Sequence, residues 1–73
     1  MKCIIRVTWD EEANVYIATS EDVPGLVLES GSFDALIEKV KFAVPELLAL
    51  NAPKAKITDL CFISERLCKV SNG

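Results

Sequence analysis

The sequence predicts one small α+β domain, in which a long helix covers one face of a sheet. Apolar and polar residues alternate over residues 2–10, which is typical of a strand, and residues 15–20 are predicted to form a second strand, with Tyr16 and Ala18 on one face and Val15 and Ile17 on the other. From Phe33 to Leu48 an apolar stripe recurs every three or four residues, which indicates an amphipathic helix. The predicted order is β-β-β-α-β, a two-layer sandwich that takes up the whole chain, residues 1–73.

The first two strands are predicted to form an antiparallel hairpin. One face of the first strand carries Cys3, Ile5, Val7 and Trp9. Residues 10–14 are polar and form the turn, where Asn14 tolerates a positive φ. We expect Trp9 and Tyr16 to pack against each other across the hairpin, because aromatic residues at such positions usually form cross-strand pairs.

Turn and cap signals separate the third strand from its neighbours. Pro24 followed by Gly25 predicts a type II turn, since proline presets one φ and glycine supplies the positive φ that must follow. Residues 26–29 then form a short strand that continues the meander. Ser32 is predicted to cap the helix. Pro45 predicts either a kink or two helical pieces, and the unbroken stripe favours the kink.

Residues 57–70 are predicted to form the last strand. Both of its faces are apolar, with Leu60 and Phe62 alternating against Cys61 and Ile63. This pattern is expected of a strand that is buried on both sides or paired with another subunit. The hydrophobic fraction of 51% in so short a chain points the same way, and we therefore expect a homo-oligomer.

The charge of the chain favours some partners over others. Eleven acidic and eight basic residues give a net charge of −3. Direct nucleic-acid binding is not expected, since that affinity depends on clustered positive charge. A basic protein is a better match for an acidic chain. Simple maintenance of solubility is the alternative reading of this charge.

Cysteine and histidine usage argues against a metal site and a disulfide framework. The chain has three cysteines and no histidine. We expect the cysteines to be small buried apolar residues, with no metal and no cofactor bound. Neither a signal peptide nor an apolar run of membrane-spanning length is apparent, which predicts a cytoplasmic protein that does not insert into membranes.

Four motifs together resemble one known family. They are the acidic turn Asp10-Glu11-Glu12, the strand Tyr16-Ile17-Ala18, the turn Asp22-Val23-Pro24-Gly25 and the helix start Gly31-Ser32-Phe33-Asp34-Ala35-Leu36. In this order and spacing they resemble the HicB family of bacterial antitoxins, in particular its short uncharacterised members, over residues 2–50.

The resemblance implies a fold like a trimmed ribonuclease H without its nuclease site. It also implies a partner, a small basic ribonuclease toxin called HicA, which HicB-type proteins bind and block. Many HicB-type proteins carry a further DNA-binding domain, and no counterpart of it follows residue 70 here. Operator binding of that kind is therefore not expected.

The candidate partner-binding residues are Asp10, Glu11, Glu12, Tyr16, Glu21 and Asp22. Two turns of a meander carry the acids, so we expect two separate groups at opposite ends of the sheet. Alternatively, these acids are simply solvated turn residues without a binding role. No catalytic residue is predicted, because a metal-dependent nuclease needs carboxylates that converge from strand interiors. A self-associating structural module and a degenerate nuclease are the alternatives to the antitoxin function.

Overall fold

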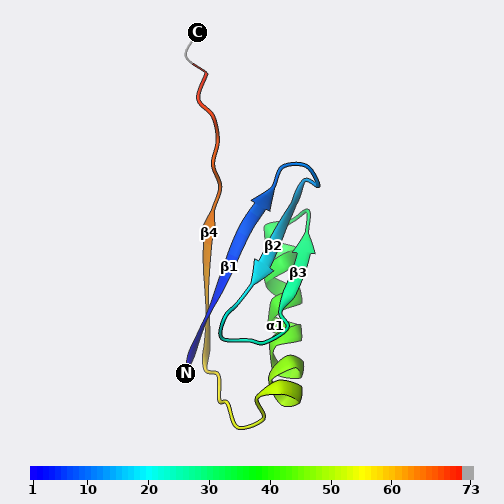
Figure 1. The fold of residues 1–73 in the computed structure, drawn as a ribbon, viewed down its shortest axis with the longest axis vertical. Helices are drawn as coiled ribbons and strands as arrows, with labels where there is room; N and C mark the ends of the chain where they lie inside the picture. Colours follow the sequence, from blue (N-terminus) through cyan, green and yellow to red (C-terminus); the bar gives the residue numbers. More distant parts are fainter. Residues whose placement is uncertain (72–73) are drawn as a thin grey trace.

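The structure, a computed structural model, describes residues 1–71 and confirms the two-layer α+β sandwich (Figure 1). Its elements are β1 (Lys2–Asp10), β2 (Val15–Thr19), β3 (Val27–Ser30), α1 (Phe33–Asn51) and β4 (Asp59–Glu65). The helix lies against one face of the sheet, over β2 and β3. This arrangement leaves β4 at the edge of the sheet, away from the helix.

The sheet has the strand order β3-β2-β1-β4. The first three strands form the predicted antiparallel meander. In contrast, β4 pairs with β1 in parallel, from Lys2 opposite Asp59 to Thr8 opposite Glu65. The sheet is therefore mixed, and α1 carries the chain across one face from β3 to β4.

The β1–β2 hairpin has the predicted pairing and turn. Trp9 lies opposite Tyr16, and their rings meet edge to face with centroids 4.8 Å apart. Asn14 has a φ of 55°, a conformation that asparagine tolerates better than most residues. Asp10 stabilises the turn, because its Oδ1 accepts hydrogen bonds from the backbone N–H groups of Glu12 and Ala13 at 3.0 and 3.2 Å.

The turn before β3 is also as predicted. Gly25 has a φ of 84°, and the Leu26 N–H donates to the Val23 carbonyl at 3.2 Å. This turn directs the side chains of Val23 and Leu26 into the core, where both are buried. The backbone conformation of Gly25 thus allows Val23 and Leu26, two residues of the β2–β3 connection, to pack into the core.

Replacing Gly25 with alanine should lower the free energy of unfolding by about 1–2 kcal/mol, since a Cβ is disfavoured at this φ. The added Cβ would lie 3.6 Å from a side-chain carbon of Leu47, an ordinary van der Waals distance. The loss of stability would therefore come from the backbone conformation and not from a clash. Gly31→Ala is the matched control, because Gly31 does not have a positive φ. A Cβ added there would lie 3.9 Å from the Asn14 carbonyl oxygen, its nearest neighbour. Urea titrations of both variants measure the difference, and equal losses would contradict the prediction.

The helix begins at the predicted cap and passes through Pro45 without a break. The Ser32 Oγ accepts from the Ala35 N–H at 3.3 Å. At the other end, the Ala52 N–H donates to the Leu48 carbonyl at 2.8 Å. The alternative of two helical pieces is therefore wrong. The apolar stripe continues in phase across the proline and holds both halves against the sheet.

The core lies between α1 and the inner face of the sheet. Its fully buried members come from both layers and from the β2–β3 connection: Cys3, Ile5, Val7, Ala18, Val23, Leu26, Leu36, Val40, Val44 and Leu48. The alternation predicted for β1 is therefore confirmed.

Two predictions for the last strand are wrong. It spans Asp59–Glu65 and not residues 57–70, because its pairing with β1 ends at Glu65. It is also not buried on both sides within the described chain, so the first of its two alternatives is wrong, and pairing with another subunit stays a prediction. Leu60 and Phe62 pack partly against the core, whereas Ile63, on the other face, is 44% exposed.

Beyond β4, residues 66–71 run past the rest of the molecule as an extended segment (Figure 1). Leu67 and Val70 are 85% and 82% exposed there. The expectation that all three cysteines are buried is wrong for Cys68, which is exposed on this segment, and holds only in part for Cys61. No neighbouring strand of the described chain is present to cover these side chains.

Candidate functional site

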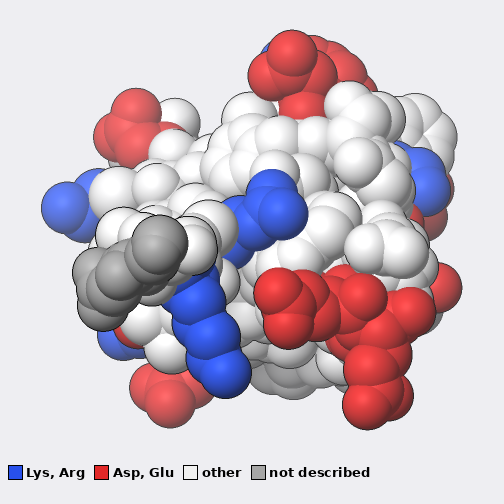
Figure 2. Space-filling model, turned by 90° about the horizontal axis from the view of Figure 1, so that it is seen from above, with Lys and Arg blue, Asp and Glu red and all other residues white. Residues whose placement is uncertain are grey.

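The acidic β1–β2 turn projects from the end of the sheet. Glu11 and Glu12 are exposed, and neither carboxylate has an ion pair or hydrogen bond among the described residues. Asp10 differs, because its carboxylate is already engaged by the turn backbone. Figure 2, which looks onto this end of the molecule, shows acidic side chains at several places around the face, with the largest group at its lower right. The turn therefore presents two free negative charges to solvent.

Beside this turn is a shallow hollow of about 370 Å³. It is lined by Thr8, Trp9, Glu11, Glu65, Arg66 and Leu67. The lining combines two carboxylates with an aromatic ring, an apolar side chain and the cation of Arg66. The two carboxylates can attract a basic side chain to this hollow, whereas the Arg66 cation in the same lining opposes its deep entry.

Arg66 forms one wall of the hollow, a position that was not predicted from the sequence. Its guanidinium carbon lies 4.1 Å from the centroid of the Trp9 ring, a cation–π contact. Its Nη1 also donates to the Tyr16 hydroxyl at 3.5 Å. No short-range pattern could indicate this contact, because Arg66 and Tyr16 are 50 residues apart in the chain.

Tyr16 is held in place by aromatic packing. Its ring meets that of Phe33, at the start of α1, edge to face with centroids 5.4 Å apart, and it meets Trp9 on its other side. The three aromatic rings of Trp9, Tyr16 and Phe33 therefore connect β1, β2 and α1. The Trp9 Nε1 is buried and has no hydrogen-bond partner among the described residues. Tyr16 does not line the hollow, but its ring packs against that of Trp9, which does.

The second acidic group lies at the opposite end of the hairpin and has a structural role. The Asp22 Oδ2 accepts from the Ile4 N–H at 2.8 Å. Ser20 completes the contact, because its Oγ donates to the Ile4 carbonyl at 2.7 Å and accepts from the Asp22 N–H at 3.1 Å. Glu21 is exposed beside them. The structure thus brings Asp10, Glu11 and Glu12 together and leaves Glu21 and Asp22 apart from them.

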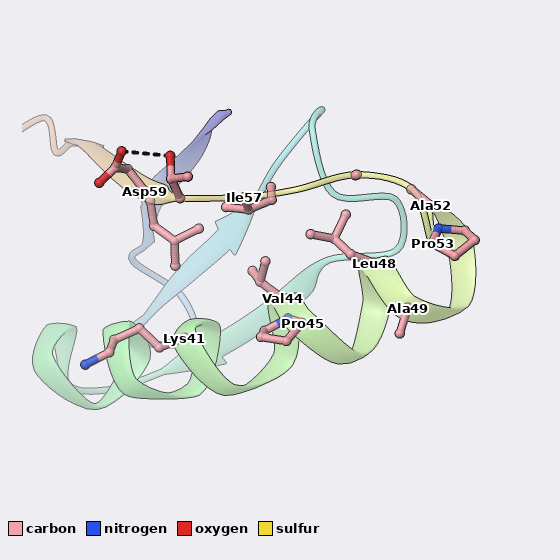
Figure 3. Close-up of a pocket in the computed structure, with 12 residues that line it drawn as sticks. Lys41, Val44, Pro45, Leu48, Ala49, Ala52, Pro53, Ile57 and Asp59 are labelled. Atoms are coloured by element: carbon pink, nitrogen blue, oxygen red, sulfur yellow. Dashed lines mark hydrogen bonds between the residues drawn. The ribbon is translucent and has the colours of Figure 1, made fainter.

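A larger cavity of about 440 Å³ lies between the end of α1 and the segment that leads into β4 (Figure 3). Most of its lining is apolar, including Val44, Pro45, Leu48 and Ile57. Lys41 and Asp59 lie at its border, and the Asp59 carboxylate accepts a hydrogen bond from Thr58 at 3.0 Å. This lining offers a mainly apolar surface with a few polar groups at its border.

Among residues 1–71, no three Asp, Glu, Cys or His side chains come together as a metal site. Burial raises the pKa of the Cys3 thiol, and the nearby Asp22 carboxylate raises it further, so this thiol is a poor nucleophile. Within the same residues no helix is long and apolar enough to cross a membrane.

The elements described above define a small α+β domain with one helix and a four-stranded sheet. It has an acidic turn at one end and an exposed edge strand, β4. The chain belongs to the family described as a domain of unknown function, DUF1902, whose model matches residues 2–70. Among solved structures it is similar to the hypothetical protein TTHA1013 from the extremely thermophilic bacterium Thermus thermophilus. The two are 31% identical with a TM-score of 0.77, over 97% of this chain and 99% of that chain. No curated protein matches the sequence.

Proposed function

We propose that this chain is a protein-binding module of the HicB antitoxin type, which neutralises a small basic HicA-type ribonuclease by covering its RNA-binding or catalytic surface. The observation that carries the proposal is the pair of unpartnered carboxylates on the β1–β2 turn, beside the hollow lined by Trp9, Glu11 and Glu65. A basic surface of the partner would contact Glu11 at the border of the hollow and Glu12 beside it.

Electrostatic complementarity supports this choice of partner. The net charge of −3 repels RNA and attracts a basic protein. A rim of exposed carboxylates mainly raises the association rate and selects against acidic partners. Occlusion requires no chemistry from this chain, in keeping with the use of Asp10 as a turn acceptor.

Reversing both free charges, in Glu11→Lys combined with Glu12→Lys, should weaken binding to a HicA-type ribonuclease encoded beside this chain by on the order of tenfold at low salt. The loss should shrink at about 0.5 M salt, where exposed charges are screened. Calorimetry and a toxin-dependent RNA cleavage assay measure affinity and neutralisation. Glu46→Lys is the control, because Glu46 is an exposed carboxylate on α1.

Two results would overturn the proposal. The first is the absence of binding between the unaltered chain and the basic neighbour. The second is an affinity that responds equally to the Glu46 and the Glu11–Glu12 reversals, since the contact would then not involve the turn. The nuclease alternative has its own test, because Mg²⁺-dependent RNA cleavage by the purified chain that survives Asp10→Asn would exclude Asp10 as a metal ligand.

A further inference from the structure

The outer edge of β4 and the extended segment 66–71 that follows it are both unpaired. β4 pairs with β1 on one side only, since it is the last strand in the order β3-β2-β1-β4. From Arg66 onward no backbone hydrogen bond to another described residue is present. Exposed edges of this kind readily pair with another chain.

Apolar side chains line the same edge. Ile63, Leu67 and Val70 are 44%, 85% and 82% exposed. Exposure of these apolar side chains to water is unfavourable, and a second strand beside them would bury part of their surface. From these observations we infer that a second copy of this chain covers the edge, with β4 and the segment 66–70 of each copy paired antiparallel across a two-fold axis at Ser64.

Symmetry restricts the register of such a pair. Side chains that lie opposite each other in an antiparallel pair point to the same face, so the two-fold axis must pass between two identical residues. With Ser64 opposite itself, Asp59 lies opposite Lys69 of the second copy, and Phe62 lies opposite Arg66. The pairing thus places two opposite charges together at each end of the new ladder.

Other registers oppose like charges or cover less of the edge. An axis at Phe62 places Asp59 opposite Glu65. An axis at Glu65 or at Arg66 places that residue opposite itself. Each of these places like charges in direct contact, which is destabilising.

Two further registers avoid this repulsion but are weaker. An axis at Ile63 gains no pair of opposite charges. An axis at Leu67 pairs Glu65 with Lys69 but leaves the first half of β4 uncovered. The Ser64 register combines complementary charge with pairing along all of β4, so that the two sheets become one continuous sheet.

Single-cysteine cross-linking tests this register directly. In a background with Cys61→Ser and Cys68→Ser, Ser64→Cys should form a disulfide-linked dimer under mild oxidation. Directly opposed residues have Cα atoms about 4.5–5.5 Å apart, within the range that a disulfide spans. Leu67→Cys in the same background is the matched control and should stay monomeric on a denaturing gel, because its two copies are far apart in this register.

Charge exchange is the second measurement, made without cross-linking. Lys69→Glu should raise the dimer dissociation constant roughly tenfold at low salt in sedimentation equilibrium, and adding Asp59→Lys should restore it. Circular dichroism checks that each variant is folded. A chain that stays monomeric at high concentration, a cross-link through residue 67 in preference to 64, or no rescue by the double exchange would each overturn the proposal.

Discussion

Replacing Leu36 with alanine should lower the free energy of unfolding by about 2–5 kcal/mol, the cost of leaving a cavity in a close-packed core. Leu36 is only 1% exposed and lies in the stripe that joins α1 to the sheet. Domains of this length bury a smaller share of their surface than larger ones do, so few other contacts can compensate. We expect the variant to be partly unfolded at 37 °C.

Thermal and urea unfolding of the variant measure this loss. Leu50→Ala is the matched control, since Leu50 belongs to the same helix but is 80% exposed. Its free energy of unfolding should change by no more than about 0.5 kcal/mol. Similar losses in the two variants would mean that α1 is not held to the sheet by this stripe.

The second large effect is expected at Asp22, where replacement by alanine should cost about 1–2 kcal/mol, because hydrogen bonds to charged groups are among the stronger ones. The carboxylate accepts the Ile4 N–H at 2.8 Å. Ile4 lies beyond the part of β1 that pairs with β2, which begins at Arg6. Asp22 and Ser20 therefore take the place of a neighbouring strand at this position.

Chemical denaturation of three variants isolates the effect. Asp22→Asn retains an oxygen acceptor and should lose only part of the stability that Asp22→Ala loses. Glu21→Ala should be close to neutral, because the Glu21 carboxylate makes no hydrogen bond among the described residues. Equal stabilities for Asp22→Ala and Glu21→Ala would contradict this role. The comparison also matters for binding studies, since a loss of affinity in an Asp22 variant can arise from a loosened β2–β3 connection.

Local signals predicted most of the individual elements. The alternation in β1, the positive φ at Asn14 and Gly25, and the cap at Ser32 each depend on residues close in sequence, and the structure contains all of them. The side chain that lies opposite Trp9 was also predictable, because the length of the turn fixes the register of a hairpin.

Contacts between distant segments could not be predicted in this way. The pattern of β4 shows that it is a strand but contains no information on its partner or direction. Its end at Glu65 is set by where its pairing with β1 stops, at Thr8, although apolar residues continue to Val70. For the same reason, neither the position of Arg66 beside Trp9 nor the hydrogen bond from Ile4 to Asp22 was expected.

The parallel pairing of β1 with β4 has a consequence for how the chain acquires its structure during synthesis. Met1 and Thr58, which flank this ladder, are 57 residues apart in sequence and are joined by a hydrogen bond. A ribosome releases β1 long before β4, so one side of β1 has no partner strand while the chain grows. The final ladder closes only after translation has passed residue 65, and ordering such a distant contact slows folding. Until that moment the backbone of β1 has one unpaired edge, and incompletely folded chains with such edges are prone to pair with other chains.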